Sequence, residues 1–389
     1  MSRVTGKHLF VLSLLIATIL MTAPLAGTAA AGKHRRGDRK HHDFVGAVYT
    51  MTNNASGNEV IMFHRTARGH LVPGGTFSTG GLGSGDGLGN QGALALSEGN
   101  RWLFVVNAGS DDVSVFRVKR DGLRLVDVQP SGGQRPISVT VDRDLLYVLN
   151  AGGAVSGVDT ITGLDVGPDG TLSPLAGSTR TLSAGNTGPA QIAFSPNGRF
   201  LAVTEKATDL IDTWRVGRNG LPSDLVSNLS EGATPFGFAF GKRHQLFVSE
   251  AAGGAPDASS MSSYELERDG TLQVVNSAVP TTETAACWVV VTGDGRFAYT
   301  TNAGSGTVSG YRIAFDGTIT LLDADGVTGS TGSGSGPIDM ALSNNGRYLF
   351  TLNGGNNTIG AFKIRADGSL SPLPGADEIP PGANGLAAL

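Results

Sequence analysis

The sequence predicts an all-β protein, folded as a seven-bladed β-propeller with four-stranded antiparallel blades. Three observations lead to this fold class. A unit of two short apolar strands joined by a tight turn recurs along the chain, Asp-Gly and Asn-Gly turns follow it, and no stretch shows a sustained helical period. The composition agrees, because 58 of 389 residues are glycine and only 16% are charged, while 40% are hydrophobic and can form a large core.

The repeating unit is clearest in residues 189–205. An apolar strand leads into the turn Ser-Pro-Asn-Gly-Arg at 195–199, and a second apolar strand ends at Glu205. The same unit recurs at residues 92–107, 136–150, 235–250, 285–302 and 337–353. Each unit continues into an alternating strand, such as 113–118 or 307–312, which is the pattern of a strand with one buried face.

Asp-Gly and Asn-Gly turns complete the units. These dipeptides tolerate the positive φ of a tight hairpin, so each one predicts a hairpin between a third and a fourth strand. They fall at residues 121–122, 169–170, 219–220, 269–270, 316–317 and 367–368. A fourth strand follows, as at 318–322, and each unit is therefore predicted to be a four-stranded meander.

The number of units follows from the residue that ends the second strand. It recurs at Asn53 or Asn54, Asn107, Asn150, Glu205, Glu250, Asn302 and Asn353. The spacing is typical of propeller blades, which are about 40 to 50 residues long. The first unit has strands near 45–50, 60–64 and 71–77 but lacks a first strand, and residues 385–389 resemble a first strand with no successor. Pairing the two closes the ring, so residues 44–389 are predicted to form one domain.

The amino-terminal residues predict export. Residues 1–31 resemble a secretory signal peptide, because Arg3 and Lys7 precede an uncharged apolar run at 9–21 and small residues follow at 28–31. The run is shorter than the roughly 20 residues that cross a bilayer. We therefore expect a secreted protein, extracellular or periplasmic, that does not insert into a membrane. Residues 32–43 form a basic, histidine-rich stretch that we expect to be a disordered leader, with attachment to an anionic surface or weak metal capture as alternatives.

Charge and cysteine content limit the partners. The chain carries a formal net charge of −4, and the leader holds more basic than acidic residues, so the predicted propeller is acidic. It lacks the basic stripe that nucleic-acid binding requires. Cys287 is the only cysteine, which excludes an intrachain disulfide, and we expect a buried thiol in a monomeric protein.

Candidate site residues come from two sets of loops that should surround the propeller axis on one face. The loops that lead into first strands contribute Gln91, Arg135, Gln191, Phe236, Cys287, Trp288 and Asp339. The ends of second strands contribute Asn107, Asn150, Glu205, Lys206, Glu250, Asn302 and Asn353. This ring of mixed charge suits a small polar or carboxylate-bearing ligand. An asparagine before glycine can serve the turn alone, whereas Glu205 and Glu250 break the asparagine pattern and are the catalytic candidates.

A glycine-rich loop occupies residues 80–92. Gly87, Gly89 and Gly92 have the spacing of a dinucleotide-binding motif, but a strand and not a helix follows, which excludes that function. We expect the loop to be a flexible cap over an axial pocket. The predicted propeller has only three histidines, and they show no metal-ligand spacing; we predict neither a metal nor a cofactor.

The turn Ser-Pro-Asn-Gly-Arg-Phe at 195–200 and the run Leu-Phe-Val-Val-Asn-Ala-Gly at 103–109 resemble the lactonase-type seven-bladed propeller family. That family includes 6-phosphogluconolactonase-like proteins and carboxymuconate cyclases, and the resemblance covers residues 44–389. It implies an active site of which Glu250 and Gln191 are present here. The histidine of that site falls on Ala190, and its two arginines fall on Phe236 and Ala303, so the chain resembles a secreted branch of the family.

Two functions follow from these residues. The first is a lactonase-like enzyme that hydrolyses or cyclises a small carboxylated lactone. Glu250 or Glu205 would be the acid or base, and Lys206 or Arg135 would hold the carboxylate. The second is a non-catalytic extracellular propeller that binds a ligand or a surface, favoured by the absent histidine and arginines.

Overall fold

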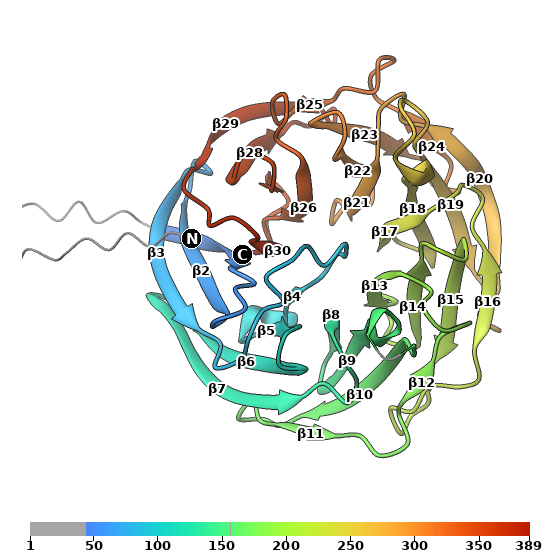
Figure 1. Ribbon diagram of the computed structural model, residues 1–389. Helices are drawn as coiled ribbons and strands as arrows, with labels where there is room; N and C mark the ends of the chain where they lie inside the picture. The colour runs from blue at the N-terminus through green and yellow to red at the C-terminus, as the bar shows by residue number, and fades with distance from the viewer. Residues whose placement is uncertain (1–43, 156) are drawn as a thin grey trace, which may run out of the picture. The chain divides into compact units, whose positions relative to one another are not determined.

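The chain forms seven β-sheets arranged in a ring (Figure 1) in the computed structural model, which describes residues 44–155 and 157–389. Each sheet is antiparallel and built on four strand positions, so the predicted fold class is confirmed. Helical structure in the described residues is confined to three short 3₁₀ turns at Glu98–Asn100, Gly152–Ala154 and Ala252–Gly254. The predicted signal peptide and leader lie outside the described residues. Within the described part, no helix has the length and apolar character needed to cross a membrane.

The blades are numbered in chain order, and their strands run outward from the axis. Blade 1 contains β30 (Asn384–Ala388), β1 (Phe44–Met51), β2 (Glu59–Thr66) and β3 (Leu71–Ser78). Blade 2 contains β4 (Leu94–Leu96), β5 (Trp102–Asn107), β6 (Asp112–Lys119) and β7 (Gly122–Pro130). Blade 3 contains β8 (Pro136–Asp142), β9 (Leu145–Asn150), β10 (Thr160–Val166), β11 (Leu172–Pro174) and β12 (Arg180–Thr181).

The remaining blades repeat this order. Blade 4 contains β13 (Pro189–Phe194), β14 (Phe200–Glu205), β15 (Leu210–Arg215) and β16 (Val226–Leu229). Blade 5 contains β17 (Pro235–Phe240), β18 (Gln245–Glu250), β19 (Ser260–Leu266) and β20 (Leu272–Pro280). Blade 6 contains β21 (Ala286–Val291), β22 (Phe297–Asn302), β23 (Thr307–Ile313), β24 (Ile319–Leu321) and β25 (Gly329–Ser330). Blade 7 contains β26 (Pro337–Leu342), β27 (Tyr348–Asn353), β28 (Thr358–Ile364) and β29 (Leu370–Ala376).

The outermost position of blades 3 and 6 is interrupted, which the sequence pattern did not predict. In blade 3, β11 and β12 both pair with β10, and in blade 6, β24 and β25 both pair with β23. Between the segments, a side chain takes the place of a backbone partner. The Ser178 hydroxyl accepts the Gly163 N–H at 3.0 Å, and the Thr328 hydroxyl accepts the Gly310 N–H at 2.9 Å. The ladder continues through these hydroxyls, so each outer position still acts as one strand.

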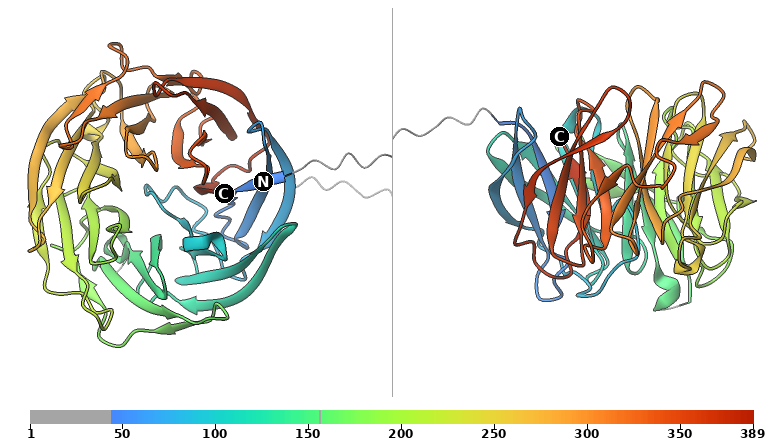
Figure 2. Two further views of the ribbon diagram at one scale, coloured as in Figure 1. Left: turned by 180° about the vertical axis from the view of Figure 1, so that it is seen from behind. Right: turned by 90° about the horizontal axis from the view of Figure 1, so that it is seen from above.

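Blade 1 joins the two ends of the described chain. β30 pairs antiparallel with β1 in the register Val48↔Ala388 and Tyr49↔Ala387, and Figure 2 shows the carboxyl end of the chain beside β1. The Arg65 side chain of β2 donates to the Leu389 carbonyl at 2.9 Å. The inner strand of blade 1 is thus β30, from the carboxyl-terminal end of the chain. The edge of β1 that faces the axis is therefore paired.

Second strands lie deepest in the core. β5, β14, β18, β22 and β27 are buried at all six of their positions. Aromatic side chains fill the space between sheets, and Tyr147, Trp214, Phe247 and Phe350 have no exposed surface. Each such side chain contributes about 1.5 to 3 kcal/mol on burial, which is how a large core replaces disulfides.

The predicted Asp-Gly turns also join neighbouring blades. Gly368 of blade 7 packs against the ring of Phe297 in blade 6, and Gly170 of blade 3 packs against Trp102 in blade 2. A Cβ would lie 2.5 Å from the ring at Gly368 and 2.7 Å at Gly170, where φ is +95° and +92°. Glycine is therefore required twice at these turns, for the positive φ and for the close approach of the ring.

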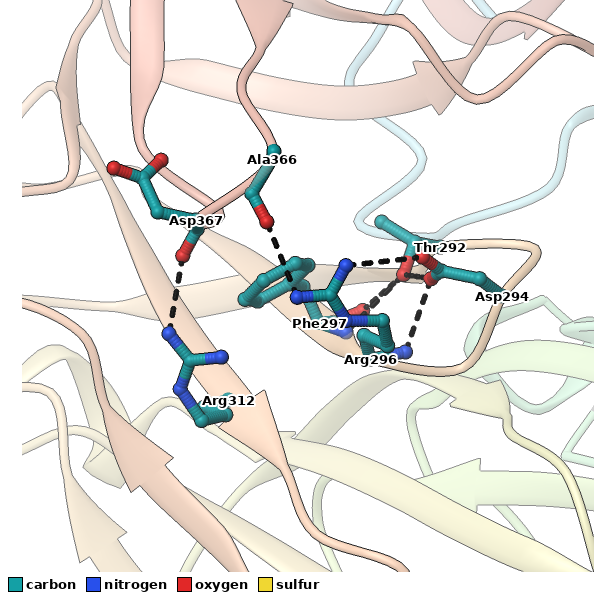
Figure 3. Close-up of polar contacts among 7 residues, drawn as sticks. All are labelled: Thr292, Asp294, Arg296, Phe297, Arg312, Ala366 and Asp367. Carbon is teal, nitrogen blue, oxygen red and sulfur yellow. Dashed lines mark hydrogen bonds and ion pairs between the residues drawn. The ribbon is translucent and has the colours of Figure 1, made fainter.

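Figure 3 shows the polar side of one such boundary. The Arg296 and Arg312 guanidinium groups lie 5.0 Å and 5.2 Å from the centre of the Phe297 ring. Arg296 donates to the Ala366 carbonyl at 3.1 Å, and Arg312 donates to the Asp367 carbonyl at 3.3 Å. Both arginines of blade 6 are thus held by the Asp-Gly turn of blade 7.

Candidate functional site

The predicted ligand-binding glutamine and aspartate of the first strands are structural links between blades. Near the start of a first strand a register shift occurs, for example between Pro189 and Gln191. The Phe238 N–H of blade 5 donates to Gln191 Oε1 at 2.7 Å, and the Leu386 N–H of blade 1 donates to Asp339 Oδ2 at 2.9 Å. Both side chains are buried, and burial raises the pKa of the Asp339 carboxyl well above its usual value. Their geometry favours satisfying buried N–H groups over contacting a ligand.

Gln91 makes the same kind of link from across the ring. In blade 5 the position that corresponds to Gln191 is Gly237, which has no side chain to offer blade 6. The Val289 N–H donates instead to Gln91 Oε1 at 3.0 Å, and Gln91 Nε2 donates back to the Val289 carbonyl at 2.9 Å. A Cβ on Gly237 would lie 2.3 Å from Gln91 Oε1, so the glycine makes room for the glutamine.

Gln91 belongs to a loop that reaches the centre of the ring between β3 and β4 (Figure 1). We call residues 85–92 the axial loop. The Trp288 indole N–H of blade 6 donates to the Asn90 carbonyl at 2.6 Å, and the Asn90 amide donates to the Ile137 carbonyl of blade 3. The Gln91 N–H donates to the Ala190 carbonyl of blade 4 at 3.0 Å. The loop predicted as a cap is therefore fastened within the axis to three blades.

Lys206 is the titratable group most closely associated with the axial loop. Its ammonium group donates to the Gly89 carbonyl at 2.5 Å and to the Pro189 carbonyl at 3.0 Å. The same nitrogen lies 4.7 Å from the centre of the Phe236 ring. Burial lowers the pKa of Lys206 to about 8, and the positive charge of Arg135 acts in the same direction. Lys206 as a residue is only half-buried, so part of its side chain remains accessible to solvent.

Arg135 lies on the other side of the axial loop. Its guanidinium group donates to the Gly87 carbonyl at 3.5 Å, and the backbone N–H of Arg135 donates to Asp111 Oδ1 at 2.7 Å. The structure therefore brings Lys206 and Arg135, the two cations considered for a carboxylate site, to the same loop, which the sequence did not show. We call the surface formed by Arg135, Lys206, Phe236 and the axial loop the axial mouth.

The floor of the axial mouth is apolar. Ala190, Phe236, Cys287 and Trp288 belong to one buried cluster, and Ala303 packs against it. Burial raises the pKa of the Cys287 thiol to about 12, so the thiol is uncharged near neutral pH. Three of these residues stand where the resemblance places a histidine or an arginine. A cavity of about 230 Å³ adjoins the loop on its opposite side, between Gly87, Ile338 and Leu352.

The asparagines that end the second strands bind their own blades. Asn107 Nδ2 donates to Ser114 Oγ at 2.7 Å, and Asn302 Nδ2 donates to Ser309 Oγ at 2.8 Å. Asn353 Nδ2 donates to Thr358 Oγ1 at 3.0 Å. Asn150 is also wholly buried, and its amide has no hydrogen-bond partner among the described residues. These positions are not exposed at the axial mouth.

Glu205 occupies the corresponding position in blade 4 and meets a second carboxyl group there. Asp212 replaces the serine seven residues later, and the Ser183 N–H donates to Glu205 Oε1 at 3.0 Å and to Asp212 Oδ2 at 3.2 Å. Neither carboxyl group is exposed. Burial, followed by the hydrogen bond and charge of Glu205, raises the pKa of Asp212, which favours the protonated form of the Asp212 carboxyl near neutral pH.

Glu250 occupies this position in blade 5. It has no exposed surface, and the Ser260 hydroxyl donates to Glu250 Oε2 at 2.5 Å. Burial raises the pKa of Glu250 to about 7. A Cβ on Gly232 would lie 2.7 Å from the carboxyl carbon, so the loop before β17 covers the group closely. The structure does not bring Glu205 or Glu250 to the axial mouth, and its geometry does not favour their predicted catalytic role.

Metal ligation has no geometric support in the part of the chain that the structure describes. No group of three or more His, Cys, Asp or Glu side chains in these residues is placed to hold an ion. His64 stacks on Phe44 at 4.3 Å between ring centres. The chemistry open to the axial mouth is therefore that of two cations, one with a lowered pKa, above an apolar floor.

Comparison with known proteins places this geometry in a family. The sequence model described as "Lactonase, 7-bladed beta-propeller" matches residues 46–158 and 264–388. The chain belongs to this lactonase family of seven-bladed propellers. No curated protein sequence matches the chain.

Solved structures show the same fold. A putative 6-phosphogluconolactonase from Bacteroides uniformis has a TM-score of 0.71 at 18% identity, covering 89% of this chain and 100% of its own. A Lactobacillus plantarum protein has a TM-score of 0.69 at 18% identity, covering 88% and 99%. A periplasmic gluconolactonase from Pseudomonas aeruginosa has a TM-score of 0.68 at 17% identity, also covering 88% and 99%. At these identities the likeness establishes the fold alone.

Sequence reasoning missed two members of the site region. Asp212 could have been found, because Asn107 and Asn302 each have a serine seven residues later and Glu205 has an aspartate at that spacing. The role of Gly237 had no local indication, since the glutamine that fills its place lies far away in sequence.

Proposed function

We propose that this propeller binds a small lactone bearing a carboxylate at the axial mouth and opens its ring by hydrolysis. The observation that carries the proposal is Lys206, which is half-buried beside Arg135 and has a pKa of about 8. Membership of the lactonase family supports the reaction class, and the apolar floor suits the carbon skeleton of such a ligand. Cyclisation of a muconate-type acid is a different reaction, in which a carboxylate oxygen adds to a C=C bond of the same molecule and a proton is delivered to the neighbouring carbon.

The two fixed carbonyls give Lys206 a defined direction. As an ammonium group it has three N–H donors, of which Gly89 and Pro189 accept two, and the third can bind the carboxylate or the lactone carbonyl. As a neutral amine it keeps both carbonyl bonds and turns a lone pair outward. A base whose pKa lies near the working pH is an effective proton acceptor, so neutral Lys206 suits the activation of water.

Hydrolysis then proceeds by addition of water to the lactone carbonyl carbon. The water oxygen forms the new C–O bond while its proton passes to Lys206 Nζ. The C–O bond of the ring breaks, and the ring oxygen takes the proton from Lys206 Nζ to become a hydroxyl group, which restores the neutral amine. Arg135 holds the substrate carboxylate, and the positive charge at the mouth stabilises the developing oxyanion.

Lys206→Met tests this proposal, because methionine keeps the length of the side chain and removes its charge and lone pair. We expect kcat/KM for a carboxylated lactone, followed by acid release, to fall about 100-fold or more. Lys242→Met is the matched control, since Lys242 is exposed in a turn between first and second strands. Full turnover by Lys206→Met, with an unchanged melting temperature, would remove Lys206 from the mechanism.

The second candidate is a propeller that binds a carboxylate without turnover. One observation favours it: the axial loop already occupies the axis and takes two of the three donors of Lys206. This function predicts saturable binding of both a lactone and its ring-opened acid, with Lys206→Met weakening both equally and no acid released. Release of acid from any carboxylated lactone tested would reject it.

We also propose that the protein is exported from the cytoplasm. The features of residues 1–31 support it, and cleavage after this segment would release the propeller outside the cytoplasm. Amino-terminal sequencing of the protein from a bacterial periplasm or culture medium tests it. An intact first residue in that material would contradict the assignment.

A further inference from the structure

Basic residues are concentrated on the face opposite the axial mouth. This face carries the turns between first and second strands and those between third and fourth strands, and we call it the turn face. Most lysines and arginines of the described residues lie in or beside these turns; the exceptions are Arg135, Arg180 and Lys206. An acidic propeller therefore has one face on which positive charge gathers.

On the turn face, four arginines surround one cavity. An open cavity of about 1110 Å³ is lined by the turns that follow β8, β13 and β15, and its charged residues are Arg143, Arg199, Arg215 and Arg218. We call it the arginine cavity. No Asp or Glu is among the described residues that line it, although Asp142 at its edge lies 3.5 Å from Arg143.

The arginines of this cavity differ from others on the same face. Arg296 and Arg312 are bonded to carbonyls of the next blade, as Figure 3 shows. Arg199 and Arg215, by contrast, are exposed, and their guanidinium groups have no hydrogen-bond or ion-pair partner within the described residues. Their donors are therefore available to a ligand.

We propose that the arginine cavity binds an anion that carries two or more phosphate groups. A guanidinium group presents a planar fork of donors that matches two oxygens of one phosphate, and four such groups around one cavity match more than one phosphate. Asn197 and Asn219 at the cavity wall add neutral donors. This site lies on the opposite face from the axial mouth and is independent of the proposed lactone chemistry.

A neighbouring cavity allows the ligand to be longer. A second cavity of about 630 Å³ shares Asn197, Arg199 and Arg215 with the first and extends to His244 and Arg268 of blade 5. Glu265 and Glu267 also line it, so the positive charge is weaker there. A chain of phosphates would start in the arginine cavity and extend only partly toward blade 5.

Calorimetric titration of the protein with inorganic tripolyphosphate tests the proposal. We expect saturable binding at one site that weakens as salt is added, because exposed charges are screened. The double variant Arg199→Ala, Arg215→Ala should bind about tenfold more weakly or worse, since both lost side chains supply charge-assisted hydrogen bonds to the anion. Both side chains are exposed and unbonded, so the melting temperature should not change.

Two comparisons make the test specific. Arg347→Ala is the matched control, because Arg347 is exposed on the turn face but lines a different cavity, which also contains Asp294. It should bind tripolyphosphate within about twofold of the unmodified protein. Citrate, a carboxylate anion of comparable charge, should bind more weakly. No saturable binding, equal weakening by Arg347→Ala, or equally tight citrate binding would each overturn the proposal.

Discussion

Two parts of the ring differ in how closely they follow their family. The family model matches residues 46–158 and 264–388, and it leaves residues 159–263 unmatched. The unmatched segment still folds as regular blades, with the same strand order as the rest, and its inner strands β13 and β17 each contain a register shift. Yet it holds Lys206, Phe236, both buried glutamates and three of the four arginines of the arginine cavity. The blade architecture is therefore regular also in the segment that the family model leaves unmatched, and this segment holds many of the residues proposed to carry chemistry.

The ends of the second strands show the difference most clearly. In the matched parts, Asn107 and Asn302 donate to serine hydroxyls of their own blades. In the unmatched segment, Glu205 and Glu250 stand at the same position, and the pKa values of Asp212 and Glu250 are raised by burial. A protonated carboxyl group can replace the asparagine amide, but only while it remains neutral. The buried carboxyl groups of the unmatched segment should therefore make its stability depend on pH, as should Asp339 in blade 7, whose pKa is also raised by burial.

Placing a carboxylate at the matched position should have the largest effect on stability. In blade 6 the Thr307 and Ser309 hydroxyls donate elsewhere, to Glu283 and to a backbone carbonyl, so their oxygens face Asn302. Asn302→Asp would bury an acceptor against acceptors, and the free energy of unfolding at pH 7 should fall by about 3 kcal/mol. Urea unfolding monitored by tryptophan fluorescence measures it. The exposed Asn344→Asp should change it by less than about 0.5 kcal/mol; equal losses would contradict the comparison.

Removing the carboxylate from blade 5 should have the opposite sign. Because the pKa of Glu250 is raised to about 7, its contribution to stability is fully present below the pKa of the unfolded chain and is lost as pH rises through 7. Glu250→Gln should therefore raise the free energy of unfolding at pH 8 by about 2 kcal/mol, after the cost of an unpaired amide donor. At pH 4 the gain should vanish.

The control for this variant is Glu267→Gln, whose side chain is exposed. The free energy of unfolding of Glu267→Gln should equal that of the unmodified protein at both pH values, because an exposed carboxylate is not desolvated in the folded state. A Glu250→Gln protein that is less stable than the unmodified protein at pH 8 would show that the carboxylate is stabilising when charged. That result would remove the distinction drawn between the two parts of the ring.

Breaking the link across the axis should have a smaller effect. Gln91→Ala removes both hydrogen bonds to Val289, which should lower the free energy of unfolding by about 1 to 2 kcal/mol and speed hydrogen exchange at the Val289 amide. Gln134→Ala, an exposed glutamine in the loop before β8, is the control and should leave that exchange unchanged. Unchanged protection in Gln91→Ala would mean that the axial loop is held by its other contacts.

Much of the fold was accessible from sequence because each blade repeats the same local chemistry. Apolar alternation and Asp-Gly turns fixed the strands, and the repeat gave their number. Packing between blades was less accessible, since the ring that meets Gly368 comes from Phe297 in another blade. The interrupted outer strands likewise depend on side chains, such as Ser178, that bond into a ladder from outside the pattern.

The candidate site was predicted in position more than in role. The sequence placed Lys206 and Arg135 on one face around the axis, and the structure brings them to the same loop. The sequence could not show that Gln191 and Asp339 accept hydrogen bonds from backbone N–H groups of the next blade. Those bonds depend on the register shifts in β13 and β26. Nor could the sequence show that Lys206 lies at the axial mouth whereas its neighbour Glu205 is buried. Adjacent residues at the end of a strand can differ in burial without any difference in the pattern around them.

The pH dependence of lactone turnover tests the central claim, that the working base is Lys206 at the axial mouth and not a buried glutamate. The account predicts that kcat/KM rises with pH through an apparent pKa of about 8, and that Glu250→Gln leaves this profile unchanged. A profile that rises through about 7 and is lost in Glu250→Gln would assign the base to Glu250 and contradict the account.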